Sequence, residues 1–523
     1  MIKKIKKIFE NTKKWVRQNP TEFALLVFIL FLGAFLRLYR ISEYMTFLGD
    51  EGRDVIIVRK LLVDFDLIAI GPGTSIGNMY LGPVYYYMMA PALLLANFSP
   101  VGPAVGIALL GIITIFFVWY VAREWFGKHA AFIASFIYAI SPTVVLYSRS
   151  SWNPNIMPFF ALLTIWSLWK LWRKKKHGWI IVTGISVSFM LQSHYLGLVI
   201  LPTVFVFWFL SFLSFKKEKK LKPFFKSSII ASIVVLLFLS PLVVFDAKYG
   251  WRNFIAMKKF FTERQATVSA KPWSSLPNMW PNFEQINIRL IAGNNDLIGK
   301  WTSINMAIGV AWIVFLKIKK RLTKTKNAAF FVLMVWLFFA LVGLGIYKQN
   351  IYDHYYGFFF PAPFLLLGGI VEEIIIRFKP KIWCNVFAGF LLFLFVNVVW
   401  INIKNNDFWN EPCRQLGRSI TVAKKIEEES NGEIFNIAVI AERNYEGAYQ
   451  YFLEKDNAKL VIIDPQKADE TIAEQLFVVC ELPEKQCMPT SNPKAEIANF
   501  GWSKVEKTWK VSGAILYKLV HSK

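Results

Sequence analysis

Long apolar segments recur along most of the chain, and they constrain its fold more than any other feature. About eleven of them approach the ~20 residues that a helix needs to cross a bilayer. They lie near residues 23–38, 101–121, 130–147, 156–172, 179–194, 196–213, 228–245, 301–316, 328–347, 357–376 and 382–402. The sequence therefore predicts an all-α polytopic membrane protein with about eleven spans and additional helices at the interface.

The net charge of +25 could indicate a nucleic-acid partner. However, the lysines and arginines cluster in the N-terminal stretch and in short loops between the apolar segments. Positive residues gather in cytoplasmic loops, so this distribution indicates membrane orientation, not a basic binding face. We exclude a nucleic-acid partner and expect a retained cytoplasmic leader at the N-terminus.

Residues 80–97 decide the orientation, because Pro83 and Pro91 interrupt this apolar segment. If it does not cross, all the basic loops fall on one side of the membrane. The charge rule therefore favours a re-entrant or interfacial segment. In this topology the N-terminus is cytoplasmic, and the loops richest in polar and aromatic residues lie on the outer face of a multi-pass protein of the plasma membrane.

After residue 402 the composition changes to that of a soluble α/β domain. We expect a membrane domain over 1–402 and an extracytoplasmic domain over 403–523. Its predicted strands are 434–441, 460–464, 475–481, 504–511 and 514–519, with helices near 416–429 and 446–455. Cys480 and Cys487 lie close enough in sequence for a disulfide in an oxidising compartment, whereas Cys384 is expected to be free.

An acidic stretch, FLGDEGRD, follows the first span and contains Asp50, Glu51 and Asp54. Charged groups beside a bilayer are costly unless they face water, a partner or a cavity. Residues 55–65 continue as an amphipathic helix that would hold the stretch at the membrane surface. We expect a catalytic outer loop over about 40–80, in which a carboxylate deprotonates an acceptor hydroxyl or binds a metal. Asp54 could instead cap the helix. The alternative is a solvated loop.

A second polar segment, YSRSSWNPN, joins two predicted spans. Arg149 could pair with phosphate, Trp152 could stack on a sugar, and the amides of Asn153 and Asn155 could bond hydroxyls. A polar helix end followed by a proline turn explains the segment equally well.

Two further outer segments carry candidates for binding a phosphate. Asp246, Lys248 and Arg252 lie where a span emerges, and basic residues outside run against the charge rule. Lipid headgroups are the alternative partner for them. His354 and Tyr355 could also contact a phosphate, although an interfacial aromatic belt explains the tyrosines as well.

Together with these features, two local patterns resemble a known family. The segment Ala122–Ala131 reads ARxxFGxxAA, and Ser141–Arg149 reads SPxxxxYSR. With the Asp-Glu pair after the first span, they are similar to the GT-C superfamily of membrane glycosyltransferases. The branch in question is family 39, which includes the protein O-mannosyltransferases and aminoarabinose transferase-like enzymes.

The resemblance implies an inverting transferase that takes a sugar from a polyprenyl-phosphate carrier at the outer face of the membrane. In the family the aspartate of the loop pair acts at the acceptor, which points to Asp50, with Glu51 as its neighbour. The mannosyltransferases follow their Ser-Arg with an aspartate, and this chain has none there. The departure leaves a divalent metal cofactor open, as it does the choice of lipid, glycan or protein acceptor.

A transporter or flippase of lipid-linked sugars would also need many spans. Transporters usually carry internal repeats and ionisable groups at the bilayer midplane, and neither is evident here. A polymerase or ligase of lipid-linked sugars shares the donor but should lack the early Asp-Glu loop. The sequence therefore favours the transferase, with the transporter and the polymerase as alternatives.

Overall fold

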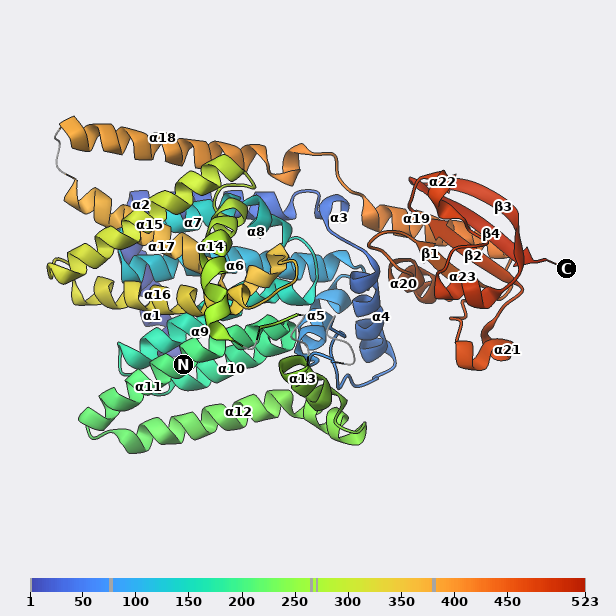
Figure 1. Cartoon of the computed structure of the whole chain (residues 1–523), viewed down its shortest axis with the longest axis horizontal. Coiled ribbons are helices and arrows are strands. Elements are labelled where there is room, and N and C mark those ends of the chain that lie inside the picture. The colour runs from blue at the N-terminus through green and yellow to red at the C-terminus, as the bar shows by residue number, and fades with distance from the viewer. Residues whose placement is uncertain (1, 75–78, 264–266, 270, 379–381, 523) are drawn as a thin grey trace.

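The architecture comes from a computed structural model, which describes residues 2–74, 79–263, 267–269, 271–378 and 382–522. Helices form an elongated bundle, and a small domain containing a β-sheet lies beyond one end of it (Figure 1). Helices satisfy their own backbone hydrogen bonds, so they are the form in which apolar segments like these can cross a bilayer. The chain is a multi-pass membrane protein.

Six of the described helices are long and apolar enough to cross a membrane. A bent pair, the short η4 and the longer α17, makes a seventh if it counts as one span. These elements are α2 (Pro20–Leu38), α6 (Val101–Trp125), η2 with α11 (Tyr195–Ile200 and Leu201–Lys217), α12 (Leu221–Lys248), α15 (Asp296–Ile318), α16 (Lys324–Gly345), η4 (Asp353–Phe359) and α17 (Pro361–Arg377).

The other predicted spans also coincide with helices, most of them shorter, although α18 has 23 residues. They are α7 (Lys128–Ile140), α8 (Pro142–Leu146), α9 (Met157–Trp172), α10 (Trp179–Ser193) and α18 (Ile382–Lys404). The segment predicted as one span over 130–147 divides at Ser141, because Pro142 cannot continue the preceding helix. The proline-interrupted segment forms only the 12-residue α5 (Val84–Leu95), with Pro91 inside it.

Small residues let the central helices pack closely. Helix α7 lies between α6 and α17. A Cβ placed on Gly368 of α17 would come within 2.7 Å of the Ala130 carbonyl oxygen, and one on Gly33 of α2 within 2.4 Å of Ile115. Close backbone approach through glycine and alanine is the usual way in which membrane helices associate, because lipid offers no hydrophobic drive between them.

Several short elements surround the end of the bundle that faces the sheet domain, and α4, α5 and α13 are visible there in Figure 1. The short elements are α3 (Ile41–Tyr44), α4 (Gly49–Val63), η1 (Asn153–Ile156), α13 (Arg252–Thr262) and η3 (Pro272–Ser275), whereas α14 (Leu276–Leu290) packs against α15 and α16. The N-terminal α1 spans Ile2–Gln18. The segment GPGTSIGN over 71–78 has a turn-rich composition and lies partly outside the described residues, and Gly71 N–H donates to Leu81 O at 2.7 Å beside it.

Helix α18 runs along the bundle and leads through η5 (Asp407–Trp409) to the sheet domain, which we define as Gln415–His521 (Figure 1). Its sheet has the order β1-β2-β4-β3, in which β1 pairs with β2 in parallel and the other pairs are antiparallel. The strands are β1 (Asn436–Ile440), β2 (Gln475–Cys480), β3 (Ser503–Val511) and β4 (Ala514–His521). The helical elements are α19 (Gln415–Ser430), α20 (Gly447–Lys455), η6 (Pro465–Lys467), α21 (Ala468–Thr471), α22 (Glu484–Cys487) and α23 (Ala495–Phe500).

One of the five predicted strands, the one over 460–464, is wrong. Only an isolated bridge between Phe435 and Leu460 forms there. Pro465 follows at once and opens a 3-10 turn that Asp464 caps by accepting from Gln466 N–H at 2.9 Å. The turn ends the extended segment before it can pair further.

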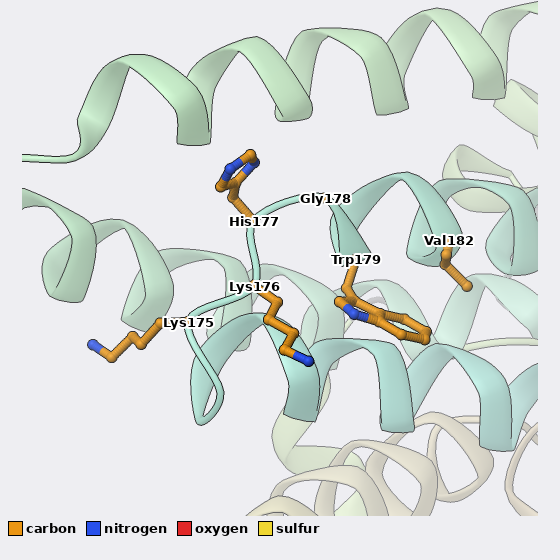
Figure 2. Close-up of a pocket in the computed structure, with 6 residues that line it drawn as sticks. All are labelled: Lys175, Lys176, His177, Gly178, Trp179 and Val182. Carbon is orange, nitrogen blue, oxygen red and sulfur yellow. The ribbon is translucent and has the colours of Figure 1, made fainter. Parts of the chain in front are cut away.

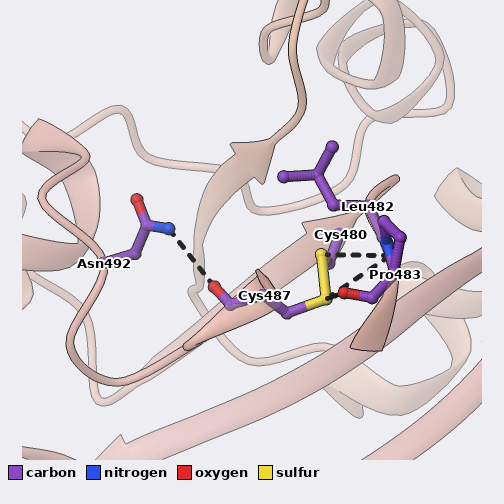
Figure 3. The surroundings of a disulfide bond; sticks show 5 residues. All are labelled: Cys480, Leu482, Pro483, Cys487 and Asn492. Atoms are coloured by element: carbon purple, nitrogen blue, oxygen red, sulfur yellow. Dashed lines mark hydrogen bonds between the residues drawn. A yellow bond between two sulfur atoms is a disulfide. The ribbon is translucent and has the colours of Figure 1, made fainter. Parts of the chain in front are cut away.

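A disulfide joins the end of β2 to the short helix α22. Figure 3 shows Cys480 and Cys487 bonded to each other, the pair that the sequence analysis selected. Asn492 donates its side-chain N–H to Cys487 O at 3.2 Å and ties the following loop to the same point. The side chain of Cys384 lies outside the described residues, and Cys413 carries an exposed free thiol.

Candidate functional site

The acidic residues lie in the first turn of a helix, so the expectation that they form a loop before residue 55 is wrong. Helix α4 begins at Gly49, and both Asp50 and Glu51 belong to its first turn. Glu51 Oε2 accepts the Leu48 N–H at 3.0 Å. Acidic side chains are favourable at a helix N-terminus, where unpaired N–H groups carry partial positive charge. Asp50 and Glu51, which were expected to take part in catalysis, therefore also lie at the start of the helix.

A single arginine bridges two of the carboxylates. Arg53 Nη1 donates to Asp50 Oδ1 at 2.8 Å, and its Nη2 donates to Asp54 Oδ1 at 2.7 Å. Tyr86 of α5 also donates its hydroxyl to Asp54 Oδ1, at 3.1 Å. The expected capping role of Asp54 is therefore wrong, because the residue lies inside the helix as the buried member of an ion pair.

The three carboxylates differ in their exposure. Glu51 and Asp54 are buried, whereas 43% of the Asp50 side chain is exposed. Burial raises the pKa of Glu51 to about 7. It also raises the pKa of Asp54 to about 6, even though Arg53 opposes the shift. Asp50 is thus the carboxylate of this helix that an incoming molecule can reach.

The sheet domain also contributes a residue to this group. Tyr445, just before α20, donates its hydroxyl to Asp50 Oδ1 at 2.9 Å, and the same hydroxyl accepts from Arg53 Nη1 at 3.3 Å. Burial raises the pKa of Tyr445, so the phenol stays protonated and acts as a donor. Sequence reasoning missed this residue, because nothing in its local sequence marks a partner so far away in the chain.

The segment YSRSSWNPN packs behind the acidic helix. Thr46 N–H donates to Ser150 Oγ at 2.9 Å, and the hydroxyls of Tyr85 and Ser151 lie 2.9 Å apart. Asn153 donates to Ser193 O at 2.6 Å, and Asn155 donates to Ser150 O at 2.8 Å. Both amides therefore hold protein backbone, as in the alternative that treated this segment as a helix end.

Arg149 of the same segment is buried against residues that precede the acidic helix. Its Nη2 is 3.3 Å from Tyr39 O, and its guanidinium carbon lies 4.6 Å from the centre of the Tyr44 ring. The Nε atom has no hydrogen-bond partner in the described part of the chain. Arg149 therefore keeps one donor unused, inside the protein and not at its surface.

Trp152 and His354, two of the expected donor-site residues, do come together. Their ring centres are 4.6 Å apart, and those of His354 and Tyr355 are also 4.6 Å apart. His194 joins the cluster, with its ring centre 5.6 Å from that of His354. The η4 helix that carries His354 is fixed by Arg289 Nε, which donates to Asp353 Oδ1 at 2.7 Å.

Asp246, by contrast, serves the backbone. It is buried and accepts the N–H groups of Asn253 and Phe254 at 2.7 and 3.1 Å, so it caps the start of α13. Lys248 lies with its Nζ 5.4 Å from the Tyr249 ring centre, and Arg252 is exposed. Of these three candidates, the two cations are the ones that face outward.

No group of three or more metal-ligating side chains occurs among the described residues. Between Asp50 and Asp54, the positive charge comes from the Arg53 guanidinium.

An open hollow lies at the far end of α9 and α10, where the turn over 173–178 carries several basic residues. Figure 2 shows the side chains that line it, namely Lys175, Lys176, His177, Trp179 and Val182, with Gly178. His177 Nδ1 lies 2.7 Å from Ser227 Oγ of α12, and Lys175 pairs with Glu218 at 3.2 Å. Because Asn153 and Ser193 meet at the other ends of the same two helices, this hollow is about a helix length away from the acidic helix.

Comparison with known proteins shows a family match over part of the chain and a fold shared over most of it. Residues 81–245 match the family described as dolichyl-phosphate-mannose-protein mannosyltransferase. A protein of Bacillus subtilis (strain 168) described as "Putative mannosyltransferase YkcB" is 29% identical over 155 residues, which are 28% of this chain and 20% of that protein. The chain thus matches only about a fifth of the length of this curated relative.

Two solved structures share the fold over most of the chain. ArnT from Cupriavidus metallidurans, bound to undecaprenyl phosphate, is 13% identical with a TM-score of 0.59, covering 96% of this chain and 98% of that one. The oligosaccharyltransferase of Archaeoglobus fulgidus is 12% identical with a TM-score of 0.52, covering 89% and 70%. From the family match over 81–245 together with this shared fold, the chain is similar to membrane glycosyltransferases of the GT-C type, in particular to family 39.

Proposed function

We propose that the chain is an inverting glycosyltransferase that moves a sugar from a polyprenyl-phosphate donor to an acceptor at the outer face of the membrane. One observation carries the proposal: Asp50 is a half-exposed carboxylate, ion-paired to Arg53, at the end of the bundle next to the sheet domain. The matched family is described by a dolichyl-phosphate-mannose donor, and the ArnT structure holds undecaprenyl phosphate. Both support a polyprenyl-phosphate donor.

In the proposed reaction Asp50 is the general base. It takes the proton of an acceptor hydroxyl while the acceptor oxygen bonds to the anomeric carbon. The bond from that carbon to the donor phosphate oxygen breaks, and its electron pair leaves with the phosphate. Inversion requires the base and the leaving phosphate on opposite faces of the sugar. The reaction balances without an oxidant or reductant.

Negative charge grows on the phosphate as it leaves, and positioned cations stabilise it in the transition state. Lys248 and Arg252 are the exposed cations among the expected donor-site residues, on the end of α12 and the start of α13. His354 and Trp152 could meet the sugar, since aromatic faces stack on it. We assign these four residues to the donor and leave Asp50 for the acceptor, with buried Glu51 as a structural neighbour of the base.

The proposed topology puts the membrane domain at 1–402 with a cytoplasmic N-terminus, and the domain over 403–523 outside the cytoplasmic membrane. The basic turns over 173–178 and 216–222 would then face the cytoplasm. Cysteine labelling in intact cells tests this part. An impermeant reagent should reach the free thiol of Cys413, and should not reach a cysteine placed in the turn over 216–222.

The test of the reaction uses purified protein in detergent with undecaprenyl phosphate mannose, labelled in the sugar, and extracted cell envelope as the acceptor. Asp50→Asn should lower transfer by ~100- to 10,000-fold, the usual contribution of a general base. Asp64→Asn is the matched control, because Asp64 is an exposed acid at the other end of α4. Binding of undecaprenyl phosphate should be the same in all three proteins.

A fully active Asp50→Asn enzyme would remove the proposed base. In protein reconstituted into vesicles, label that stays on the carrier while it crosses the membrane would favour the transporter. Label in a growing chain of repeat units would favour the polymerase. If mannose is the wrong sugar, the same assay is repeated with other polyprenyl-phosphate sugars before the function is judged.

A further inference from the structure

The sheet domain touches the proposed base directly. The Tyr445 hydroxyl is 2.9 Å from Asp50 Oδ1, although the two residues are 395 positions apart in the chain. Gly49 makes room for the phenol, since a Cβ there would lie 2.3 Å from the Tyr445 ring. The backbone of α4 therefore packs against the Tyr445 ring, and the Tyr445 hydroxyl reaches the Asp50 carboxylate.

This placement rests on a rigid contact between the two domains. A Cβ on Gly52 would lie 2.2 Å from the carbonyl carbon of Gly447, and one on Gly447 would lie 2.6 Å from Gly49 O. The backbones of α4 and α20 thus meet with no side chain between them. Farther along α20, Tyr451 donates its hydroxyl to Phe98 O at 2.5 Å. Tyr445 is held by these contacts two residues before α20 begins.

Both hydrogen bonds to Asp50 fall on the same oxygen. Arg53 and Tyr445 donate to Oδ1 from two directions, and 43% of the side chain is still exposed. A half-exposed aspartate would otherwise rotate freely, whereas two donors on one oxygen fix the plane of the carboxylate. Fixing a reactive group before substrate arrives lowers the cost of reaching the productive geometry.

We propose that Tyr445 is a positioning residue, which holds the Asp50 carboxylate so that its other oxygen faces the acceptor hydroxyl. The inference rests on the proposed function, because it assigns a role to Tyr445 only if Asp50 is the base. It makes the sheet domain a part of the acceptor site: the acceptor must reach Asp50 alongside the loop that precedes α20.

The test compares Tyr445→Phe with Tyr451→Phe in the full-length protein. Each variant loses one phenol hydroxyl that bonds across the same domain interface, but only the first touches Asp50. Tyr445→Phe should lower kcat for transfer from undecaprenyl phosphate mannose roughly tenfold or more, as expected for a lost hydrogen bond to a charged group. Tyr451→Phe should keep the wild-type kcat. Both should bind undecaprenyl phosphate as the wild type does.

Wild-type turnover in Tyr445→Phe would overturn the inference, and so would an equal loss in both variants, because the hydroxyl would then only help the domains to dock. Melting temperatures of the two variants should agree, which separates a lost docking contact from a misplaced base. The Asp50→Asn result distinguishes the two claims. If that variant is active, the proposed function fails; if it is inactive while Tyr445→Phe is unimpaired, only the positioning role fails.

Discussion

Carboxylates cluster at both ends of the helical bundle, and their surroundings differ. At the end with the basic turns, Glu124 accepts from Lys170 Nζ at 2.7 Å and from Trp166 Nε1 at 2.9 Å, and Lys174 lies 3.6 Å away. Glu373 is fully buried and pairs with Lys326 and Arg377. At the other end Asp50 and Asp54 share Arg53, and Asp50 keeps almost half of its side chain exposed.

The difference separates acids that hold helices together from an acid that can react. Glu124 and Glu373 each have at least two donors, from a neighbouring helix or from their own, so an incoming hydroxyl would have to displace them. Asp50 has donors on one oxygen and an exposed face. Proximity to the membrane, which first drew attention to the acidic stretch, does not distinguish the structural acids from the reactive one. The number of donors around each carboxylate distinguishes them.

Neutralising one acid from each end gives the largest contrast. Asp50→Asn should reduce transfer by ~100- to 10,000-fold with little change in melting temperature. Glu124→Gln should leave transfer unchanged and lower the melting temperature, because it removes a partly buried partner of Lys170 and leaves the proposed site intact. Turnover and thermal melting of both variants, measured side by side, check this. If Glu124→Gln lost turnover as severely as Asp50→Asn, exposure would not identify the reactive acid.

Within α4, Asp54→Asn should mainly affect stability. The carboxylate is buried against Arg53 and Tyr86, so the variant leaves the guanidinium without its inner counter-charge. Breaking a buried ion pair by removing one partner costs about 3 kcal/mol or more. Chemical denaturation in detergent measures it. A loss below about 0.5 kcal/mol, the range of ordinary surface substitutions, would return Asp54 to the minor role first expected of it.

The contact between α4 and the sheet domain can be tested through glycine. Gly52→Ala forces a methyl group against the Gly447 backbone, and overpacking of this kind costs about 1–3 kcal/mol. We expect the sheet domain to loosen and proteases to cut between α18 and α19 sooner. Gly417→Ala in α19 is the control, since nothing lies within 4 Å of a Cβ there. Equal protease resistance in the two variants would show that the close approach does not hold the domain.

The smallest expected effect is a change in pH dependence. Burial raises the pKa of Glu51 from 4.5 to about 7, so the folded protein binds a proton there that the unfolded chain releases. Its contribution to stability is present at low pH and is lost as the pH rises from about 4.5 through 7. Glu51→Gln should flatten this part of the stability profile. Asp54, with its pKa raised to about 6, should keep some of the slope.

Melting temperatures at several values of pH between 4.5 and 8 measure the effect. The exposed Glu411 supplies the control, as Glu411→Gln should leave the profile unchanged. An unaltered slope in Glu51→Gln would mean that Glu51 titrates as an ordinary carboxyl group.

Hydrophobic periodicity predicted the helices of the bundle well, because each membrane helix must satisfy its own backbone within one segment. The strands at 436–440, 475–480, 503–511 and 514–521 were predicted nearly as well, since strands enriched in β-branched and aromatic residues are local patterns. The prediction of a strand over 460–464 was wrong because strand pairing there depends on a partner, and the chain turns away at Pro465. Local signals predict local structure.

The candidate site was harder to predict, because its contacts connect distant segments. The sequence pointed to Asp50 and, separately, to Trp152 and His354, but not to Arg53 as a shared partner or to Tyr445. Asp246, Asn153 and Asn155 were plausible ligands by residue type, and the structure engages all three with backbone groups. Whether a polar side chain is free for a substrate depends on which donors and acceptors the fold brings near it.

The 395-residue separation between Asp50 and Tyr445 affects how the protein is made. Ribosomes add about 5–20 residues per second, so Tyr445 is synthesised roughly 20–80 seconds after Asp50. During that interval the first helices can enter the membrane, but the Asp50 carboxylate has only its local arginine beside it. A nascent or truncated chain that ends before the sheet domain would carry every proposed donor contact. Its Asp50 carboxylate, however, would lack the hydrogen bond from Tyr445. Full activity would then arise only when synthesis is almost finished, which delays efficient use of the donor until the whole protein is in place.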